Sequence, residues 1–369
     1  MVNWYTKGAF FMLKYEQLIQ RIKQNIQDGI WKPGDKLPSD RIVCEQFDVS
    51  GITVRRAKND LLAEGVLEQF AGRKGVFVKH AEEPVSTNLV GVAIDGLKDP
   101  FFANILHGIE DRLWDDKFHP ILCSAYFGLE KLEAYCQSLL TQNVAGVILA
   151  PVKGNNYIEN NKRLAALLAA HKIPLVLLDR YIPQMLLNSV VSDNRQASAE
   201  LTRRLIKKGH RRILVLAGVE CSSINDRLHG HFDALEEAGF DRDDALVVRV
   251  DDVRFQMHQH YEEELARIRN LIEQAGDFSA CYTMSSVILQ EAIQSFFGRR
   301  KGPKKPIEIV TYDNNIQELR DITERVTYVK QPAYQMGWEA ANLLIQTLDN
   351  PNRPITQLTL PSEIIEKAL

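Results

Sequence analysis

The stretch from Pro38 to Val78 restricts the fold of this chain more than any other stretch does. Ser39 can cap a short helix, and Ser50 can cap a second helix in which apolar residues between Val54 and Leu62 form one buried face. Two short β-runs follow, joined by a basic tip at residues 71–74 that contains glycine. Two helices joined by a tight turn and followed by a hairpin predict a winged helix-turn-helix, which lays its second helix in the major groove of DNA.

The second of these helices also carries a basic side. Thr53, Arg55, Arg56 and Lys58 are expected opposite its apolar face, and arginine is the side chain best suited to a bidentate contact with guanine. A basic helical face is also common on ordinary solvated helices, so this feature alone leaves both interpretations open. A preceding helix over residues 13–27 and a turn at residues 32–35 favour the DNA-binding interpretation, because they complete a head of residues 13–80.

The head resembles the DNA-binding domain of the GntR family. The matching motifs, in order along the chain, are Lys32-Pro33-Gly34-Asp35, Leu37-Pro38-Ser39, Val49-Ser50, Thr53-Val54-Arg55, Leu62-Ala63-Glu64-Gly65 and Gly72-Arg73. The resemblance implies most of the DNA contacts, and two basic neighbours complete the predicted DNA-binding set: Arg41, Ser50, Thr53, Arg55, Lys58, Gly72, Arg73 and Lys74. Gly51 departs from the family pattern, which usually has arginine after the Val-Ser pair, and so the usual operator preference is not carried over.

Charge is distributed unevenly along the 369 residues. Residues 1–80 carry 13 Lys and Arg against 9 Asp and Glu, a net charge of +4, whereas the whole chain carries −3. A basic head on an acidic remainder suits contact with nucleic acid at one end. The five cysteines lack disulfide or metal-site spacing, and no run approaches the ~18 apolar residues of a membrane span. We therefore expect reduced thiols, no membrane contact and a cytoplasmic location.

Beyond a polar linker at residues 81–88, apolar β-runs alternate with helical patterns. The expected strands are Leu89–Ile94, Pro120–Cys123, Gly146–Leu149, Leu175–Leu178, Ser189–Val191, Ile213–Ala217, Leu246–Val250, Ala280–Thr283, Ile307–Thr311 and Arg325–Val329. Apolar strands separated by helices predict an α/β fold with parallel sheets covered on both faces. Because so many strands exceed one sheet of usual size, we expect two doubly wound subdomains with a ligand cleft at the carboxyl ends of their strands.

Polar side chains follow several of these expected strands. They are Asp95, Asp179-Arg180, Asp193-Asn194, Asp313-Asn314 and Lys330-Gln331. A carboxylate can accept hydrogen bonds from two neighbouring hydroxyl groups, and guanidinium and amide groups can donate to others. Each acidic residue taken alone could equally be a helix N-cap, which is the favoured interpretation of Asp99. Taken together, the set predicts a site for a polyhydroxylated ligand.

Residues 89–369 resemble the effector domain of the LacI family, which has the type I periplasmic-binding-protein fold. The matching stretches, in family order, are Asp99-Pro100-Phe101-Phe102, residues 146–151, Leu178-Asp179-Arg180, residues 191–194, residues 208–213, Asp226-Arg227-Leu228-His229-Gly230, Tyr312-Asp313-Asn314 and residues 329–337. The resemblance and the strand ends give the predicted effector-binding set: Asp95, Phe101, Phe102, Arg180, Asp193, Arg227, Asp313 and Gln331. Met284 stands where the family often has a polar ligand contact, which points to an unusual effector or a lost contact.

These features predict a ligand-responsive transcription regulator, specifically a homodimeric repressor of carbohydrate-utilisation genes that binds operator DNA and a sugar. The expected parts are a tail or start-site extension at residues 1–12, the head at 13–80, the linker at 81–88 and an effector and dimerisation body at 89–369. Two alternatives stay open: a solute sensor without DNA function, and an enzyme. No G-x-S-x-G, P-loop or strand-linked G-x-G-x-x-G favours the enzyme. Because His229 and His231 point different ways on a helix, we expect no metal, and we expect no cofactor.

Overall fold

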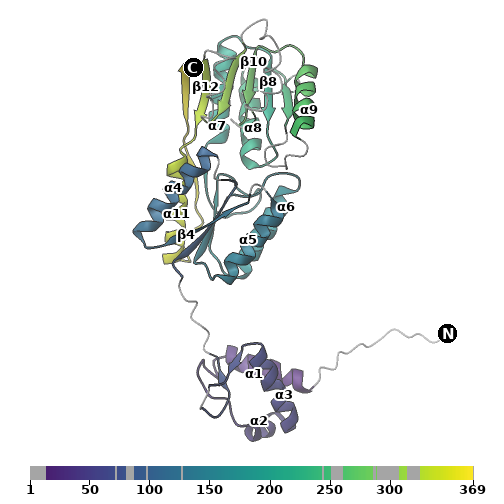
Figure 1. The fold of residues 1–369 in the computed structure, drawn as a ribbon, viewed down its shortest axis with the longest axis vertical. Coiled ribbons are helices and arrows are strands. Elements are labelled where there is room, and N and C mark those ends of the chain that lie inside the picture. The colour runs from purple at the N-terminus through teal and green to yellow at the C-terminus, as the bar shows by residue number, and fades with distance from the viewer. Residues whose placement is uncertain are drawn as a thin grey trace, which may run out of the picture. The chain divides into compact units, whose positions relative to one another are not determined.

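A computed structural model describes residues 14–70, 73–79, 87–96, 99–125, 128–242, 245–250, 261–285, 288, 307–313 and 325–368. The chain forms two compact units, Met1–Ser86 with the head and Thr87–Leu369 with the body, and each is drawn in Figure 1. The predicted tail at residues 1–12, most of the linker and Gly72 of the wing tip lie outside the described residues.

The described residues of the head form three helices and a small antiparallel hairpin, which confirms the predicted winged helix-turn-helix. Its elements are α1 (Lys14–Gln27), α2 (Asp40–Phe47), α3 (Gly51–Ala63), β1 (Leu67–Glu68) and β2 (Phe77–Val78). Apolar residues from all three helices and the hairpin form one core that includes Ile22, Val54 and Leu61. Ser50 caps α3 as predicted. Ser39 holds the N-cap position of α2, but the predicted capping hydrogen bond is not formed.

The first half of the body, together with α11 and β13 from near the C-terminus, forms an N-terminal subdomain around a six-stranded parallel sheet, with strand order β13-β7-β6-β5-β3-β4. The strands are β3 (Leu89–Ile94), β4 (His119–Ser124), β5 (Gly146–Leu149), β6 (Leu175–Leu178), β7 (Asn188–Ser192) and β13 (Gln357–Leu360). Two pairs of helices cover it: α4 (Pro100–Asp115) with α11 (Ala333–Asp349), and α5 (Leu129–Thr141) with α6 (Tyr157–Ala170). Two separate apolar clusters therefore lie on the two faces of one sheet, as the buried central strands β3, β5 and β6 predict.

The C-terminal subdomain repeats this plan with strand order β14-β12-β11-β10-β8-β9, and among its described strands β14 alone pairs antiparallel. Its strands are β8 (Ile213–Ala217), β9 (Leu246–Arg249), β10 (Ala280–Thr283), β11 (Glu308–Tyr312), β12 (Arg325–Lys330) and β14 (Glu363–Ala368). The helices α7 (Asn194–Lys207) and α8 (Ser222–Glu237) cover one face, and α9 (Tyr261–Gln274) packs on the other. The predicted pair of doubly wound subdomains is thereby confirmed.

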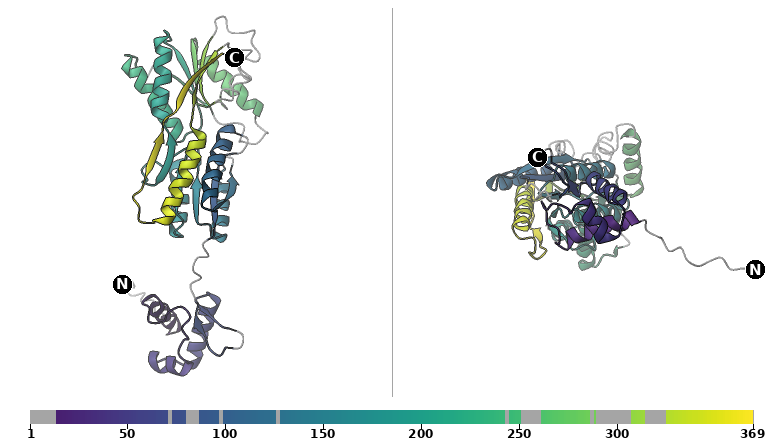
Figure 2. Two further views of the ribbon diagram at one scale, coloured as in Figure 1. Left: turned by 90° about the vertical axis from the view of Figure 1, so that its left-hand side faces the viewer. Right: turned by 90° about the horizontal axis from the view of Figure 1, so that it is seen from below.

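Glycine allows α4 and α11 to touch along their backbones, and Figure 2 shows these two helices side by side. A Cβ atom on Gly108 would lie 2.0 Å from the Tyr334 carbonyl oxygen, and one on Gly337 would lie 1.9 Å from the Ile105 carbonyl oxygen. No side chain fits at such distances, so the two glycines are required by the contact itself.

The chain crosses between the two subdomains after β7, after β12 and after β13. The crossing segments are tied together, because Asp193 N donates to Leu360 O at 2.9 Å and Ser192 Oγ donates to Gln331 Oε1 at 2.5 Å. The strand β13 and the strand β14 that follow these crossings were missed by the sequence prediction. Half-exposed and exposed residues alternate along Gln357–Leu360, which is the weak pattern of an edge strand rather than an apolar run.

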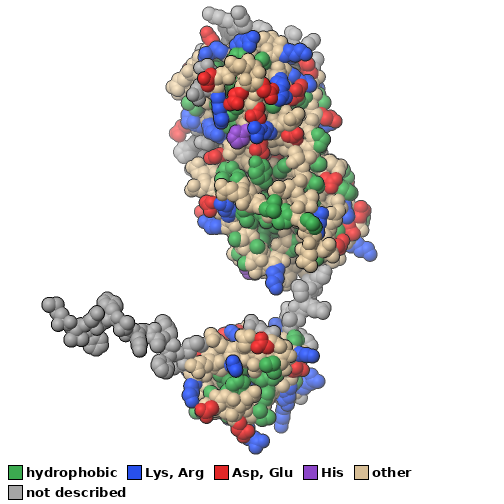
Figure 3. All heavy atoms as spheres, turned by 180° about the vertical axis from the view of Figure 1, so that it is seen from behind, with side chains coloured by type: hydrophobic (Ala, Val, Ile, Leu, Met, Phe, Trp, Pro, Cys, Tyr) green, Lys and Arg blue, Asp and Glu red, His purple; other side chains and the backbone are tan. Residues whose placement is uncertain are grey.

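On the face of the body seen in Figure 3, hydrophobic side chains gather over the N-terminal subdomain, whereas acidic and basic side chains intermingle over the C-terminal subdomain. Outward-facing ion pairs between α7 and α8 include Arg195 with Asp233 at 2.6 Å and Arg203 with Glu237 at 2.8 Å. Within the described residues, no helix combines the length and the apolar character that crossing a membrane requires.

Candidate functional site

The exposed side of α3 begins with a short polar network. Thr53 N donates to Ser50 Oγ at 3.3 Å, and the two hydroxyl groups lie 2.9 Å apart. One helical turn after Ile52, the side chain of Arg55 is 79% exposed. Ser50 therefore fixes the first turn of α3, while Arg55 projects from the next turn with its guanidinium group accessible to a partner.

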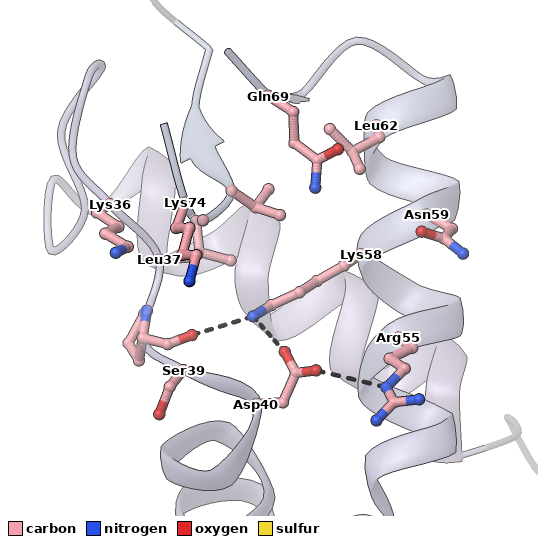
Figure 4. A pocket seen from close by; sticks show the side chains of 13 residues that line it. Lys36, Leu37, Ser39, Asp40, Arg55, Lys58, Asn59, Leu62, Gln69 and Lys74 are labelled. Carbon is pink, nitrogen blue, oxygen red and sulfur yellow. Dashed lines mark hydrogen bonds and ion pairs between the residues drawn. The ribbon is translucent and has the colours of Figure 1, made fainter. Parts of the chain in front are cut away.

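A groove of about 590 Å³ runs between α3, the segment before α2 and the wing. Figure 4 shows Asp40 in this groove between two cations of α3. Arg55 Nε lies 3.7 Å from Asp40 Oδ2, and Lys58 Nζ lies 2.8 Å from Asp40 Oδ1. Lys74 lines the same groove from the wing. Asp40 on α2 thus contacts Arg55 through the Nε atom, and the Arg55 guanidinium group stays exposed.

Lys58 requires a correction to the predicted basic face. Its side chain is only 9% exposed, and its ammonium group also donates to Pro38 O at 3.0 Å. Lys58 therefore joins α3 to the segment before α2 instead of facing outward with Arg55. The sequence contained the signal for this, because residues 54, 57, 58 and 61 follow the i, i+3, i+4, i+7 spacing of one helical face.

The other basic side chains of the head differ in their surroundings. Arg41 on α2 and Lys74 in the wing are exposed. Arg73 lies over the Phe77 ring with its guanidinium carbon 5.6 Å from the ring centre, and Arg56 lies 4.2 Å from the centre of the Tyr15 ring on α1. Exposed positive charge therefore comes from α2, α3 and the wing, which is the arrangement needed to follow a phosphate backbone.

In the body, Asp95 and Arg180 form a buried ion pair at the carboxyl ends of β3 and β6. Arg180 Nη2 lies 2.6 Å from Asp95 Oδ2, and the exposed fractions of the two side chains are 1% and 5%. Asp179 lies 3.4 Å from Arg180 Nε, and Lys153 lies 3.7 Å from Asp95. Burial raises the pKa of Asp95 to about 6, although Arg180 and Lys153 oppose the shift.

Asp313 follows β11 and is held by Gln331, which stands where the chain crosses between the subdomains after β12. The Gln331 amide donates to both carboxylate oxygens of Asp313, at 3.1 and 2.9 Å, and its own oxygen accepts from Ser192. Desolvation raises the pKa of Asp313 to about 7, Arg227 opposes this rise, and the nearby charges of Asp99 and Asp179 add to it. Charges of both subdomains therefore act on one carboxylate.

Arg227 on α8 is buried and held from three sides. Its Nε donates to Asn194 Oδ1 at 2.7 Å, and its Nη1 donates to the backbone oxygen of Met284. Its guanidinium carbon lies 3.6 Å above the Tyr312 ring, whose hydroxyl donates to Asn194 O at 2.9 Å. Met284 itself is buried in the apolar core, so this departure from the family pattern positions Arg227 through its backbone.

The remaining predicted effector residues stand at two helix N-termini. Phe101 and Phe102 begin α4, are buried, and meet edge to face with ring centres 5.2 Å apart. Asp99 accepts from Phe101 N and caps α4, as the favoured interpretation predicted. Asp193 caps α7 by accepting from Gln196 N at 3.0 Å, whereas the next residue, Asn194, is buried beside Arg227.

The two subdomains touch each other through loops and the start of α8, beyond their strand ends. Tyr181 OH donates to Asp226 at 3.0 Å, and Gly154 N donates to Glu220 O at 2.9 Å. The structure thus brings Asp95 to Arg180 and Gln331 to Asp313, and the charge of Arg227 acts on Asp313. Lys153, Asn194 and Tyr312 belong to these clusters but were not predicted as ligand contacts, because strand-end position alone does not reveal which of several neighbours turns inward.

Comparison with known proteins assigns both parts of the chain. Residues 87–366 match the family of periplasmic binding proteins and sugar-binding domains of the LacI family, and residues 14–78 match bacterial regulatory proteins of the gntR family. The arabinose metabolism transcriptional repressor of Geobacillus stearothermophilus is 27% identical over 346 residues, which is 91% of each chain. The ribose operon repressor of Haemophilus influenzae is 24% identical and aligns with 77% of this chain and 81% of its own.

A solved structure agrees with these matches. The transcriptional regulator CelR in complex with cellobiose superposes with a TM-score of 0.63 at 25% identity and covers 86% of this chain and 90% of its own. Both resemblances that the sequence suggested are thereby confirmed. The chain belongs to the family of periplasmic binding proteins and LacI-type sugar-binding domains, carries a gntR-type head, and is a DNA-binding transcription regulator that responds to a ligand.

Proposed function

We propose that the protein is a repressor whose operator affinity is set by a sugar bound between the two subdomains of the body. The observation that carries this proposal is that each subdomain places a carboxylate with a donor beside it at its strand ends: Arg180 contacts Asp95 in one subdomain, and Gln331 donates to Asp313 of the other. Buried carboxylate, guanidinium and amide groups from both sides suit a small ligand with many hydroxyl groups. The arabinose, ribose and cellobiose named for the relatives support a sugar.

In this proposal each predicted ligand residue has a chemical task. Asp313 and Asp95 accept hydrogen bonds from sugar hydroxyls, and Arg227 and Gln331 donate to them. Phe101 and Phe102 cover the apolar side of the ring from the N-terminus of α4. Arg180 holds Asp95 ionised and oriented, and Asn194 takes the inward position that Asp193 was predicted to hold.

A ligand that contacts both subdomains binds one relative arrangement of them better than another, and only such a difference in affinity can shift their equilibrium. The chain crosses between the subdomains beside Ser192, Gln331 and Leu360, and hydrogen bonds join these three segments. They form the hinge about which the subdomains rotate. Gln331 belongs to this hinge and also donates to Asp313. A ligand that binds to Asp313 therefore acts directly on the hinge.

The head supplies the output. We place α3 in the major groove with Arg55 and Thr53 at base edges, and Arg41, Arg73 and Lys74 on phosphates. The body forms the homodimer, which places two heads on two half-sites. The exposed Trp114 on α4 and the exposed Tyr334 on the adjacent α11 support an apolar protein contact there, since such large side chains are enriched in interfaces.

The test separates the two halves of the proposal. Mono- and disaccharides are screened by thermal shift with the full chain, because a ligand at ~100 times its Kd stabilises the folded state by about 2.7 kcal/mol. Operator binding is then measured with and without the sugar that stabilises the protein.

We expect Arg227→Ala to lose the thermal shift and the sugar response while it retains operator binding. Arg55→Ala is expected to weaken operator binding about tenfold or more and to retain the thermal shift. If the protein binds a sugar but binds DNA without sequence specificity, and Arg55→Ala does not change that DNA affinity, the protein is a solute sensor without DNA function. A shift retained in Arg227→Ala would remove Arg227 from the site.

A further inference from the structure

Ile52, the second residue of α3, has the most exposed side chain among the large hydrophobic residues that the structure describes. Its exposed fraction is 81%, compared with 46% for Ile42 on α2. An isoleucine in this position adds nothing to the core of the head, whose members on α3 are Val54, Ala57 and Leu61. It is placed on the same side of the helix as Arg55, three residues later.

The preceding residue, Gly51, has no side chain, so the first turn of α3 is less bulky there. A Cβ atom on Gly51 would meet nothing within 4 Å, and the backbone there does not adopt the left-handed conformation that favours glycine. Gly75 in the wing differs on both counts, since its φ is +125° and a Cβ atom would lie 2.3 Å from Lys36 Cε. The fold requires glycine at position 75 and tolerates other residues at position 51.

The first turn of α3 therefore presents one apolar branched side chain, and Arg55 follows it on the same side of the helix, one turn later. Ser50 and Thr53, the flanking polar residues, use their hydroxyl groups on each other. In the major groove the only apolar group on a base edge is the C5-methyl group of thymine. Ile52 matches that group in size and polarity, and Gly51 lets the helix backbone approach closely enough for contact.

We propose that Ile52 reads a thymine methyl group in each half-site of the operator. This inference rests on the proposed DNA-binding function and specifies the base that the first turn of α3 recognises. Three helical residues rise ~4.5 Å and successive base pairs are ~3.4 Å apart. The thymine therefore lies within about two base pairs of the guanine read by Arg55.

The experiment replaces thymine by uracil, which lacks only the methyl group. Binding sequences are first selected from a random duplex pool by the full-length protein. Each thymine of the selected operator is then changed singly to uracil, and Kd is measured for the unaltered protein, for Ile52→Ala and for the control Ile42→Ala. Melting temperatures verify that the variants fold, which is expected because both side chains lie on the surface.

At one thymine per half-site we expect uracil to weaken binding about threefold to fivefold, as the loss of one buried methyl group implies. That penalty should be retained in Ile42→Ala and should disappear in Ile52→Ala, whose affinity for the thymine operator is reduced to a similar extent. A protein indifferent to uracil at every position, or a penalty that persists in Ile52→Ala, overturns the assignment while the DNA-binding function stands. A pool that yields no specific sequence overturns that function and the inference with it.

Discussion

The two candidate recognition sites of this protein contain the same kinds of side chain in opposite environments. In the head, Arg55 is 79% exposed and Asp40 beside it is 42% exposed. In the body, Arg180 and Asp95 form the same kind of pair with exposed fractions of 1% and 5%. A DNA duplex is too large to enclose, so the side chains that bind it must project, whereas a small ligand can be surrounded by groups that are already desolvated.

Charge therefore contributes differently to the stability of each part. The exposed pair interacts through water and contributes little to folding. The buried pair carries a desolvation cost that only its partners offset, so its members depend on one another.

The largest expected effect is the difference in free energy of unfolding between two arginine-to-alanine variants, Arg180→Ala in the buried pair and Arg55→Ala in the exposed pair. Arg180→Ala leaves Asp95 and Asp179 buried without their main cationic partner, and breaking a buried pair in this way costs about 3–5 kcal/mol. Arg55→Ala removes an exposed cation and should change the free energy of unfolding by less than about 1 kcal/mol. Urea denaturation of the full chain, followed separately for the head and the body, measures both. Similar small effects at both sites would contradict the contrast.

The second prediction concerns the pH dependence of the body. The folded state keeps a proton on Asp313 up to about pH 7, whereas the unfolded chain loses it near its ordinary pKa of 3.8. The contribution of Asp313 to stability is therefore greatest at low pH and falls as pH rises through this interval. Asp313→Asn should lose this dependence, so its stability relative to the unaltered protein should increase between pH 4 and pH 7.

The same carboxyl group links sugar binding to protons. A sugar hydroxyl that donates to Asp313 favours its ionised form, so binding below about pH 7 should release protons, and affinity should rise with pH and then level off. Calorimetry in buffers of different ionisation enthalpy measures the release. Asp95, with a pKa of about 6, supplies the release that remains in Asp313→Asn. Proton release that is the same in both proteins would exclude Asp313 from the linkage.

The smallest effect is expected at Lys58, the cation of the head that is buried like those of the body. Its partner Asp40 is partly exposed and can be solvated if the ammonium group is removed. Lys58→Met keeps the length of the side chain, and we expect it to change stability by less than about 1 kcal/mol and operator affinity by less than about threefold. A tenfold loss of operator affinity in this variant would restore Lys58 as a DNA contact.

The sequence predicted the buried strands well because their apolar runs report directly on a covered parallel sheet. Leu89–Ile94, Gly146–Leu149 and Ile213–Ala217 begin and end where expected. The edge strand Gln357–Leu360 lacked such a run, since its stability comes from pairing with β7 rather than from burial on both faces. A hydrophobic pattern identifies strands that are buried on both faces. It gives little information about an edge strand that is held by pairing with one neighbouring strand.

In the candidate sites, too, the sequence predicted the position of a residue along the chain but not the direction of its side chain. Strand-end position indicated that Asp193 and Asn194 lie near the ligand, but the start of α7 decides which of them turns inward, and Asp193 is used as its cap. The orientation of Arg227 depends on Asn194, Tyr312 and the Met284 backbone, which are brought together only by the tertiary fold. Lys58 differs, because its burial was readable from helical spacing.

The glycine contact between α4 and α11 has a consequence for how a signal leaves the body. Gly108 and Gly337 bring the two backbones so close that neither helix can slide along the other without a clash. The helix α11 begins directly after the hinge at Gln331, and α4 follows β3, the first strand after the linker. If an effector rotates the subdomains about the proposed hinge, α4 and α11 should therefore keep their relative position, and the N-terminal subdomain should move as one rigid body.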